Sequence, residues 1–292
     1  MRDHRPLRPL AATLSLISIM VLSIAAANAG KSEVEMQRQV ESSLLVRGTI
    51  DITADGDVVG YALDTSDKIP PGIADMVARL APQWRFEPIP LPNNAIGRTD
   101  MHLLFVASTL ESGDYRVELR NVSFSTDRPP QERLTIARRG RPVEYPPDLN
   151  AMAVGGTVYV EVQVGRDGKV INLGVSKVNL TTVGSETEMA KWRTQLTAAS
   201  IKAVRGWRFA PPTAGVDVGA LSWNGTLPIS FSRWNEAKSK PGRWQTYIPG
   251  PRNALPWLDS LNTAIDNSDT LTPDQLHSGK EARRLIGPID GS

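Results

Sequence analysis

The chain has 292 residues, of which 40% are hydrophobic and 22% are charged, a length that suits about two domains of ordinary size. It contains no cysteine, which excludes disulfides, cysteine metal sites and thiol catalysis, so any folded part must be held by apolar cores. The formal net charge of +2 at pH 7 leaves no basic footprint, and we therefore expect no nucleic-acid partner.

The amino terminus has the pattern of an export signal. An uncharged, mostly apolar stretch at 10–26 follows three basic residues, which are Arg2, Arg5 and Arg8. Small residues then stand at Ala27 and Ala29, just before Gly30. This A-x-A pattern predicts cleavage after Ala29 and a mature protein that begins at Gly30 in a Gram-negative periplasm. The alternative is an uncut inner-membrane anchor on the periplasmic side, because about 20 apolar residues can span a bilayer.

The first expected module covers 30–127. Residues 31–43 are polar and predict a short leading helix or a mobile arm. Residues 44–54 alternate with period two and run into Asp55-Gly56, which predicts a hairpin whose second strand lies at 58–63. A helix is then expected after Pro70-Pro71, because apolar residues recur there every three or four positions. Further strands are predicted at 101–106 and between 115 and 124.

A proline-rich and charged stretch at 128–140 predicts a linker to a second module at 141–235. In that module 156–164 alternates strictly and Asp167-Gly168 turns the chain into a strand at 170–178. Ser185 and Glu188 have the spacing of a capping box at the start of a long helix. A last strand is expected at 227–231.

The same phrase follows the helix in both modules. Its residues are Trp84, Arg85, Phe86 and Pro88 in the first copy and Trp207, Arg208, Phe209 and Pro211 in the second. The turns before these phrases match at an offset of 112 residues, so that Asp55-Gly56 corresponds to Asp167 and Gly168. An internal duplication is therefore predicted. The aromatic residues are expected in the cores, and the arginines at the carboxy termini of the helices.

The tail at 236–292 has a different character. Its aromatic residues lie among lysine, proline and glycine, with too few aliphatic residues for a core of its own. We expect the first part to pack on the second module and 267–292 to be mobile, so that the tail is partly disordered. The alternative is an arm that binds a partner.

Residues 141–232 resemble the TonB carboxy-terminal domain family almost from end to end. The resemblance rests on Tyr145-Pro146, the alternating strand and its Asp-Gly turn, the Trp-Arg-Phe-x-Pro phrase and the final 228–231. Residues 44–107 resemble a degenerate copy that lacks the Tyr-Pro pair. The resemblance implies an α+β fold of two β-β-α-β modules, each a small antiparallel sheet packed on one helix.

In that family the module binds an extended peptide, the TonB box of an outer-membrane receptor. The resemblance therefore implies a periplasmic protein of TonB-dependent transmembrane transport that pairs a partner strand with an exposed sheet edge. By similarity the partner-binding residues form two segments, which are Val143, Glu144, Tyr145 and Pro146, and Thr226, Leu227, Pro228, Ile229, Ser230 and Phe231.

The chain departs from a full energy transducer of the family, which is anchored in the inner membrane and has a long proline-rich spacer. Neither an obvious retained anchor nor such a spacer is present, so ExbB and ExbD are expected as partners only if the signal stays uncut. A structural envelope protein that binds peptidoglycan or an assembly partner is the alternative. No catalysis, cofactor or metal is expected, because His102 and His277 lack any companion motif.

Overall fold

The structure is a computed structural model of the chain. It describes residues 40–88, 91, 95–110, 112–125, 129–232, 242–258, 268–271, 274–278 and 284–289. The expected export signal, with Ala27, Ala29 and Gly30, and the leading segment up to residue 39 lie outside these residues. The described part is a mixed α+β structure with mostly antiparallel sheets and few helices. None of its helices is both long and apolar enough to cross a membrane.

The first sheet is built around one long strand. Its strands are β1 (Glu41–Ile52), β2 (Val58–Leu63), β4 (Gly97–Thr109), β5 (Tyr115–Ser125) and β11 (Gln245–Tyr247). On one side β1 pairs with β4, which in turn pairs with β5. On its other side β1 pairs with β11 at its start and with β2 at its end. Helix α2 (Pro71–Leu80) buries Ile73 and Val77 against this sheet.

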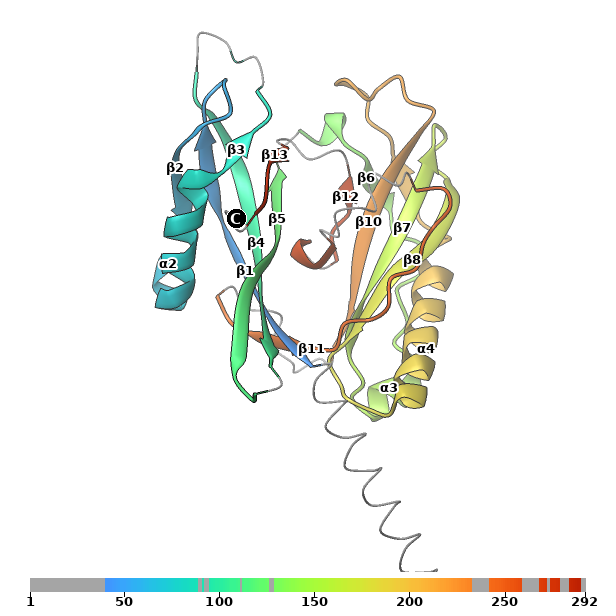
Figure 1. Cartoon of the computed structure of the whole chain (residues 1–292). Coiled ribbons are helices and arrows are strands. Elements are labelled where there is room, and N and C mark those ends of the chain that lie inside the picture. Colours follow the sequence, from blue (N-terminus) through green and yellow to red (C-terminus); the bar gives the residue numbers. More distant parts are fainter. Residues whose placement is uncertain are drawn as a thin grey trace, which may run out of the picture. The chain divides into compact units, whose positions relative to one another are not determined.

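The second sheet has β7 (Gly156–Gly165) between β8 (Val170–Leu180) and β10 (Ser222–Phe231), with the short strand β12 (His277–Ser278) outside β10. Helix α4 (Glu186–Val204) lies against one face of this sheet (Figure 1). The helix begins at the predicted capping box. The Glu188 amide donates to the Ser185 hydroxyl (3.3 Å), and the Ser185 amide donates to the Glu188 carboxylate (2.9 Å).

Shorter elements complete the described part. Helix α3 spans Pro147–Ala151, and two small pairings join β3 (Arg85–Phe86) to β13 (Leu285–Ile286) and β6 (Thr135–Arg138) to β9 (Arg208–Ala210). The 3-10 turns are η1 (Ser66–Lys68), η2 (Ala81–Gln83), η4 (Pro130–Glu132) and η5 (Ser268–Thr270).

Each sheet has its own apolar core, and both cores contain the aromatic residues of the repeated phrase. Trp84 and Phe86 are buried and meet the ring of Phe124 edge to face, at 5.8 and 4.7 Å between ring centroids. Trp207 and Phe209 are buried in the second core. Such aromatic packing supplies a large apolar area at the point where helix and sheet meet.

The hairpin turn and the repeated phrase contact each other in the same way in both copies. The Phe86 amide donates to the Gly56 carbonyl (2.9 Å), and the Phe209 amide donates to the Gly168 carbonyl (3.0 Å). Both glycines have positive φ, 91° and 72°. A Cβ atom would lie 2.0 Å from the Phe86 oxygen at Gly56 and 2.3 Å from the Phe209 oxygen at Gly168. Glycine is therefore needed for the turn and for the close approach of the phrase.

The arginines of the phrase do not bond to helix ends as expected. Arg85 forms an ion pair with Asp57 in the hairpin. Arg208 donates to the carbonyl of Trp207 (3.1 Å), which lies beyond the last residue of α4. Both arginines thus contact the hairpin or the phrase itself, because the chain has already left the helix when it reaches them.

Two segments without a predicted strand pair as strands. In the expected linker, Thr135–Arg138 pairs with β9, and the adjacent Leu134 is buried in the second core. In the tail, 245–247, 277–278 and 285–286 pair with β1, β10 and β3. The first part of the tail packs on the second module as expected, since Ile248 is buried in the second core and exchanges main-chain bonds with Leu180. Its pairing with the first sheet through β11 was not expected. These strands are two to four residues long, too short to carry an alternating pattern.

The glycine contact generates the first prediction. Gly168→Ala should lower the free energy of unfolding by about 2–5 kcal/mol, because a positive φ costs alanine about 1–2 kcal/mol and the added methyl overlaps the Phe209 carbonyl. Gly113 is the matched control, since its φ is 87° but nothing lies within 4 Å of an added Cβ. Gly113→Ala should lower the free energy of unfolding only by the cost of the positive φ, about 1–2 kcal/mol. Equal losses in urea denaturation of the two variants would contradict the close-approach argument.

Candidate functional site

The outer edge of β10 is the candidate site. The tail covers part of this edge, with Ser278 opposite Gly225 and His277 opposite Thr226 in antiparallel pairing. One further main-chain bond extends the pairing, from the Asp274 amide to the Pro228 carbonyl (2.7 Å). The edge therefore holds an extended segment by main-chain hydrogen bonds.

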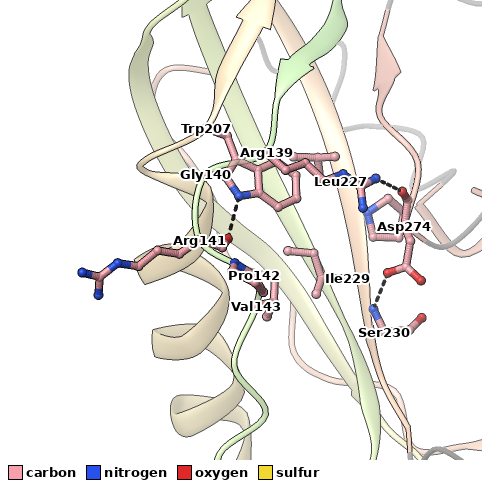
Figure 2. Close-up of a pocket in the computed structure, with 11 residues that line it drawn as sticks. Arg139, Gly140, Arg141, Pro142, Val143, Trp207, Leu227, Ile229, Ser230 and Asp274 are labelled. Carbon is pink, nitrogen blue, oxygen red and sulfur yellow. Dashed lines mark hydrogen bonds between the residues drawn. The ribbon is translucent and has the colours of Figure 1, made fainter.

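A cavity of about 320 Å³ lies beside this edge, between 139–143, β10 and Asp274 (Figure 2). Apolar side chains of Val143, Trp207, Leu227 and Ile229 line it, and its polar residues are Arg139, Arg141, Ser230 and Asp274. The volume is at the lower end of the range of about 300–1,000 Å³ for small-molecule pockets. The cavity thus suits an apolar side chain better than a cofactor.

Polar contacts fix the residues around the cavity. The Asp274 carboxylate accepts from the Ser230 amide (3.3 Å), and the Asp274 carbonyl accepts from the Arg139 guanidinium (2.8 Å). The Trp207 indole donates to the Arg141 carbonyl (3.3 Å). The Arg139 guanidinium also lies 5.2 Å from the centroid of the Trp207 ring. Trp207 therefore supports the wall at 139–143 as well as the core.

Pro228 leaves the edge of β10 with one main-chain donor fewer than a regular strand has. Its carbonyl points outward, because it accepts from the tail, and the nitrogen of a strand residue points to the same side as its carbonyl. That nitrogen has no hydrogen to donate. An outer strand can thus form only an interrupted ladder, as is typical of protected sheet edges.

The residues expected to bind a partner divide into two groups. Val143, Leu227, Pro228, Ile229 and Ser230 line the cavity. The others contact the protein itself. Tyr145 donates to the Val154 carbonyl (2.8 Å) and packs edge to face on Phe231 at 5.4 Å, while Thr226 donates to Glu161 (2.8 Å). Glu144 forms an exposed ion pair with Lys202 (3.1 Å), and Pro146 precedes α3.

The sequence reasoning missed Arg139 and Asp274, although both contact the edge. Arg139 lay in the expected linker and Asp274 in the tail that was expected to be mobile. A weak signal was the presence of apolar residues a few positions away, which are Leu134 and Ile136 before Arg139 and Leu276 after Asp274, and all three pack on the second core.

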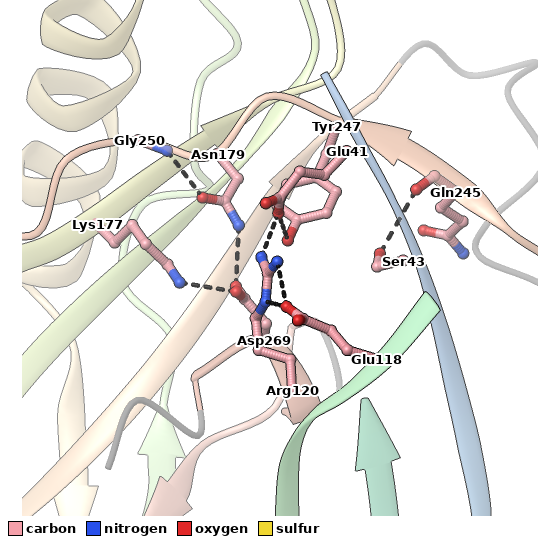
Figure 3. A network of polar contacts seen from close by, with 10 residues as sticks. All are labelled: Glu41, Ser43, Glu118, Arg120, Lys177, Asn179, Gln245, Tyr247, Gly250 and Asp269. Atoms are coloured by element: carbon pink, nitrogen blue, oxygen red, sulfur yellow. Dashed lines mark hydrogen bonds and ion pairs between the residues drawn. The ribbon is translucent and has the colours of Figure 1, made fainter. Parts of the chain in front are cut away.

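A second polar cluster attaches the tail to β8 (Figure 3). Asp269 accepts from the Lys177 ammonium (2.8 Å) and from the Asn179 amide (2.9 Å). The Lys177 and Asp269 side chains are only 8% and 14% exposed. The ammonium also lies 5.3 Å from the centroid of the Tyr159 ring. This is a buried ion pair with additional hydrogen bonding, the arrangement that offsets the desolvation of its charges.

Glu41 fastens the first part of the tail to the first sheet. The Tyr247 hydroxyl donates to its carboxylate (2.7 Å), and so does Arg120 (2.5 Å), which also contacts Glu118 (2.7 Å). Burial, together with the bond to Glu41, raises the pKa of Tyr247 above its ordinary value. Burial alone would lower the pKa of Arg120, but its bonds to the two carboxylates raise it overall. The cluster thus consists of one guanidinium, two carboxylates and a phenol, joined by hydrogen bonds.

The buried ion pair generates the second prediction. Asp269→Ala removes the carboxylate that faces Lys177, and breaking such a pair typically costs about 3–5 kcal/mol of unfolding free energy. Glu87→Ala is the control, because it removes an exposed ion pair of the tail, with Arg284. Exposed pairs contribute about 0–1 kcal/mol. A loss with Asp269→Ala no larger than the control, measured by urea denaturation, would show that this pair does not hold the tail.

The described residues contain no group of three or more His, Asp or Glu side chains that could hold a metal ion. No protein-family model matches the chain, and neither a curated protein nor a solved structure matches it. The TonB resemblance and the partner that it implies therefore stay predictions.

Proposed function

We propose that this chain binds an extended segment of a protein partner by strand pairing at the outer edge of β10. The observation that carries the proposal is the pairing of the tail with this edge. There β12 and Asp274 pair antiparallel with β10 through main-chain groups. Any extended chain has these groups, whereas the cavity beside the edge can select a side chain.

A comparison of the two sheets supports the choice of β10. In each sheet a strand that follows the helix and the repeated phrase pairs back with the first strand, β4 with β1 and β10 with β7. The outer side of β4 is paired with β5 over Asp100 to Thr109. Among the described residues, the outer side of β10 is paired with two residues of β12. The second sheet thus has the edge that a partner can take more easily, and the first acts as a scaffold.

The finer fold is part of this proposal. We infer two related β-β-α-β modules, because β1, β2, α2 and β3 follow the same order as β7, β8, α4 and β9. The same glycine–phenylalanine contact in both supports a duplication. With the sequence motifs, this favours a TonB-like tandem protein of the periplasm. Its partner would be a TonB-box-like segment of an outer-membrane receptor.

A structural envelope protein is the second candidate. It is favoured by the number of strand edges that the tail covers within the chain itself, on β1, β3 and β10. A protein whose role is to hold an assembly together has no need of an open edge.

Titration of the full-length protein with receptor-derived TonB-box peptides, followed by amide chemical shifts, tests the proposal. We expect shifts along Gly225–Phe231 with an affinity on the order of micromolar or weaker, because a short strand makes few hydrogen bonds and must be ordered. Ser230→Pro removes an outward amide donor and should weaken binding about tenfold or more. Ile171→Ser changes an exposed residue of β8 and should leave binding unchanged.

The lack of any shift at millimolar peptide, in the parent protein and in variants with a loosened tail, would favour the structural candidate instead. Unchanged binding in a folded Ser230→Pro variant would overturn the β10 edge as the site, because the peptide would then bind elsewhere.

A further inference from the structure

On the basis of the proposed function, we propose that Asp274–Ser278 is a built-in competitor for the β10 edge. We further propose that the partner strand places an acidic residue where Asp274 now lies and an apolar residue where Leu276 now lies. The tail then indicates which side chains the partner has, because both segments must contact the same groups on β10 and Arg139.

The acidic position is defined by three contacts of Asp274. Its amide donates to the Pro228 carbonyl (2.7 Å), its carboxylate accepts from the Ser230 amide (3.3 Å), and its carbonyl accepts from Arg139 (2.8 Å). The bond from the Ser230 amide to the carboxylate is charge-assisted, and such bonds are stronger than neutral ones. The Arg139 guanidinium bonds to the main-chain carbonyl of Asp274 and places a positive charge near this position. An uncharged side chain in this position should bind more weakly.

The apolar position is defined by Gly225. A Cβ atom on Gly225 would lie 2.8 Å from a terminal methyl of Leu276, so the glycine leaves room for that side chain. Leu276 packs on the second core through this gap. Ser278 adds a further contact, because its hydroxyl donates to the Leu134 carbonyl (3.1 Å). The site therefore accepts an acid-x-apolar pattern followed by a short antiparallel pairing.

The pairing of the tail with β10 is weak enough for a partner strand to replace it. It has only two paired positions in β12, and Asp274 itself is exposed. Each hydrogen bond contributes about 1 kcal/mol net, and Pro228 supplies no amide donor. A tethered segment nevertheless competes at a millimolar effective concentration. The apparent affinity of a partner is therefore the intrinsic affinity multiplied by the fraction of chains whose β10 edge is free. A partner must thus outcompete the tail.

The test uses a synthetic peptide with the sequence of residues 270–280, added to the full-length chain. The parent should bind it with a dissociation constant in the millimolar range. The variants Asp274→Lys and Leu276→Asp, in the chain only, should loosen the tail and bind the peptide about tenfold or more tightly. A peptide in which the Asp274 position is asparagine should bind these variants about fivefold or more weakly. Amide shifts of β7 and β8 report that the second sheet of each variant is folded.

The outcomes separate the competitor from the binding function. Equal affinity of the parent and both loosened variants would overturn the competitor while leaving strand capture intact. Equal affinity for the aspartate and asparagine peptides would overturn the acidic requirement. If the folded variants bind neither this peptide nor any TonB-box peptide, strand capture itself is wrong.

Discussion

Unpaired main-chain groups on strand edges are the constraint on which this structure depends. Two small sheets leave several edges, and each N–H or C=O that stays unpaired away from water costs free energy. The tail supplies partners in short pieces, with β11 on β1, Ile248 on Leu180, β12 on β10 and β13 on β3. None of these strands is longer than three residues within the described part of the tail, so each adds little alone. Together they turn the tail from an appendage into part of both folded layers.

The repeated glycine–phenylalanine contact shows how the two copies stay alike although their helices differ in length. Helix α2 has 10 residues and α4 has 19. Both copies nevertheless return to the same hairpin turn, because the phenylalanine of the phrase is bonded to Gly56 in the first copy and to Gly168 in the second. A change in helix length is absorbed before this point, and the geometry of the sheet is preserved.

Local patterns predicted the parts of the fold that local chemistry determines. The hairpin at 156–178 and the start of α4 at Ser185 follow from alternation, an Asp-Gly turn and a capping box. The strand expected at 101–106 is longer, since β4 starts at Gly97 with polar residues whose partners lie in β1. Likewise Pro82 lies in a 3-10 turn that ends the helix before Trp84. Tertiary pairing decided what the sequence pattern left open.

Only the part of the site formed by Val143 and β10 was predictable from the sequence. Val143 and the residues of β10 came from the motif resemblance, and they line the cavity. Asp274 reaches Ser230 from 44 positions away and Arg139 from 135 positions away, so no periodicity links them. Their roles arise from the placement of the tail, which consists of short segments without a pattern of their own.

The pairing of β11 with β1 has a consequence for the biogenesis of the protein. Ser42 and Thr246 are 204 positions apart, so the edge of β1 is made long before the strand that covers it. At a synthesis rate of about 5–20 residues per second, this edge waits on the order of 10–40 s. During that interval the first three residues of β1 lack the partner strand β11, and another copy of the same chain can pair with them instead. Spacing between those copies is then as important to its yield as the stability of the finished fold.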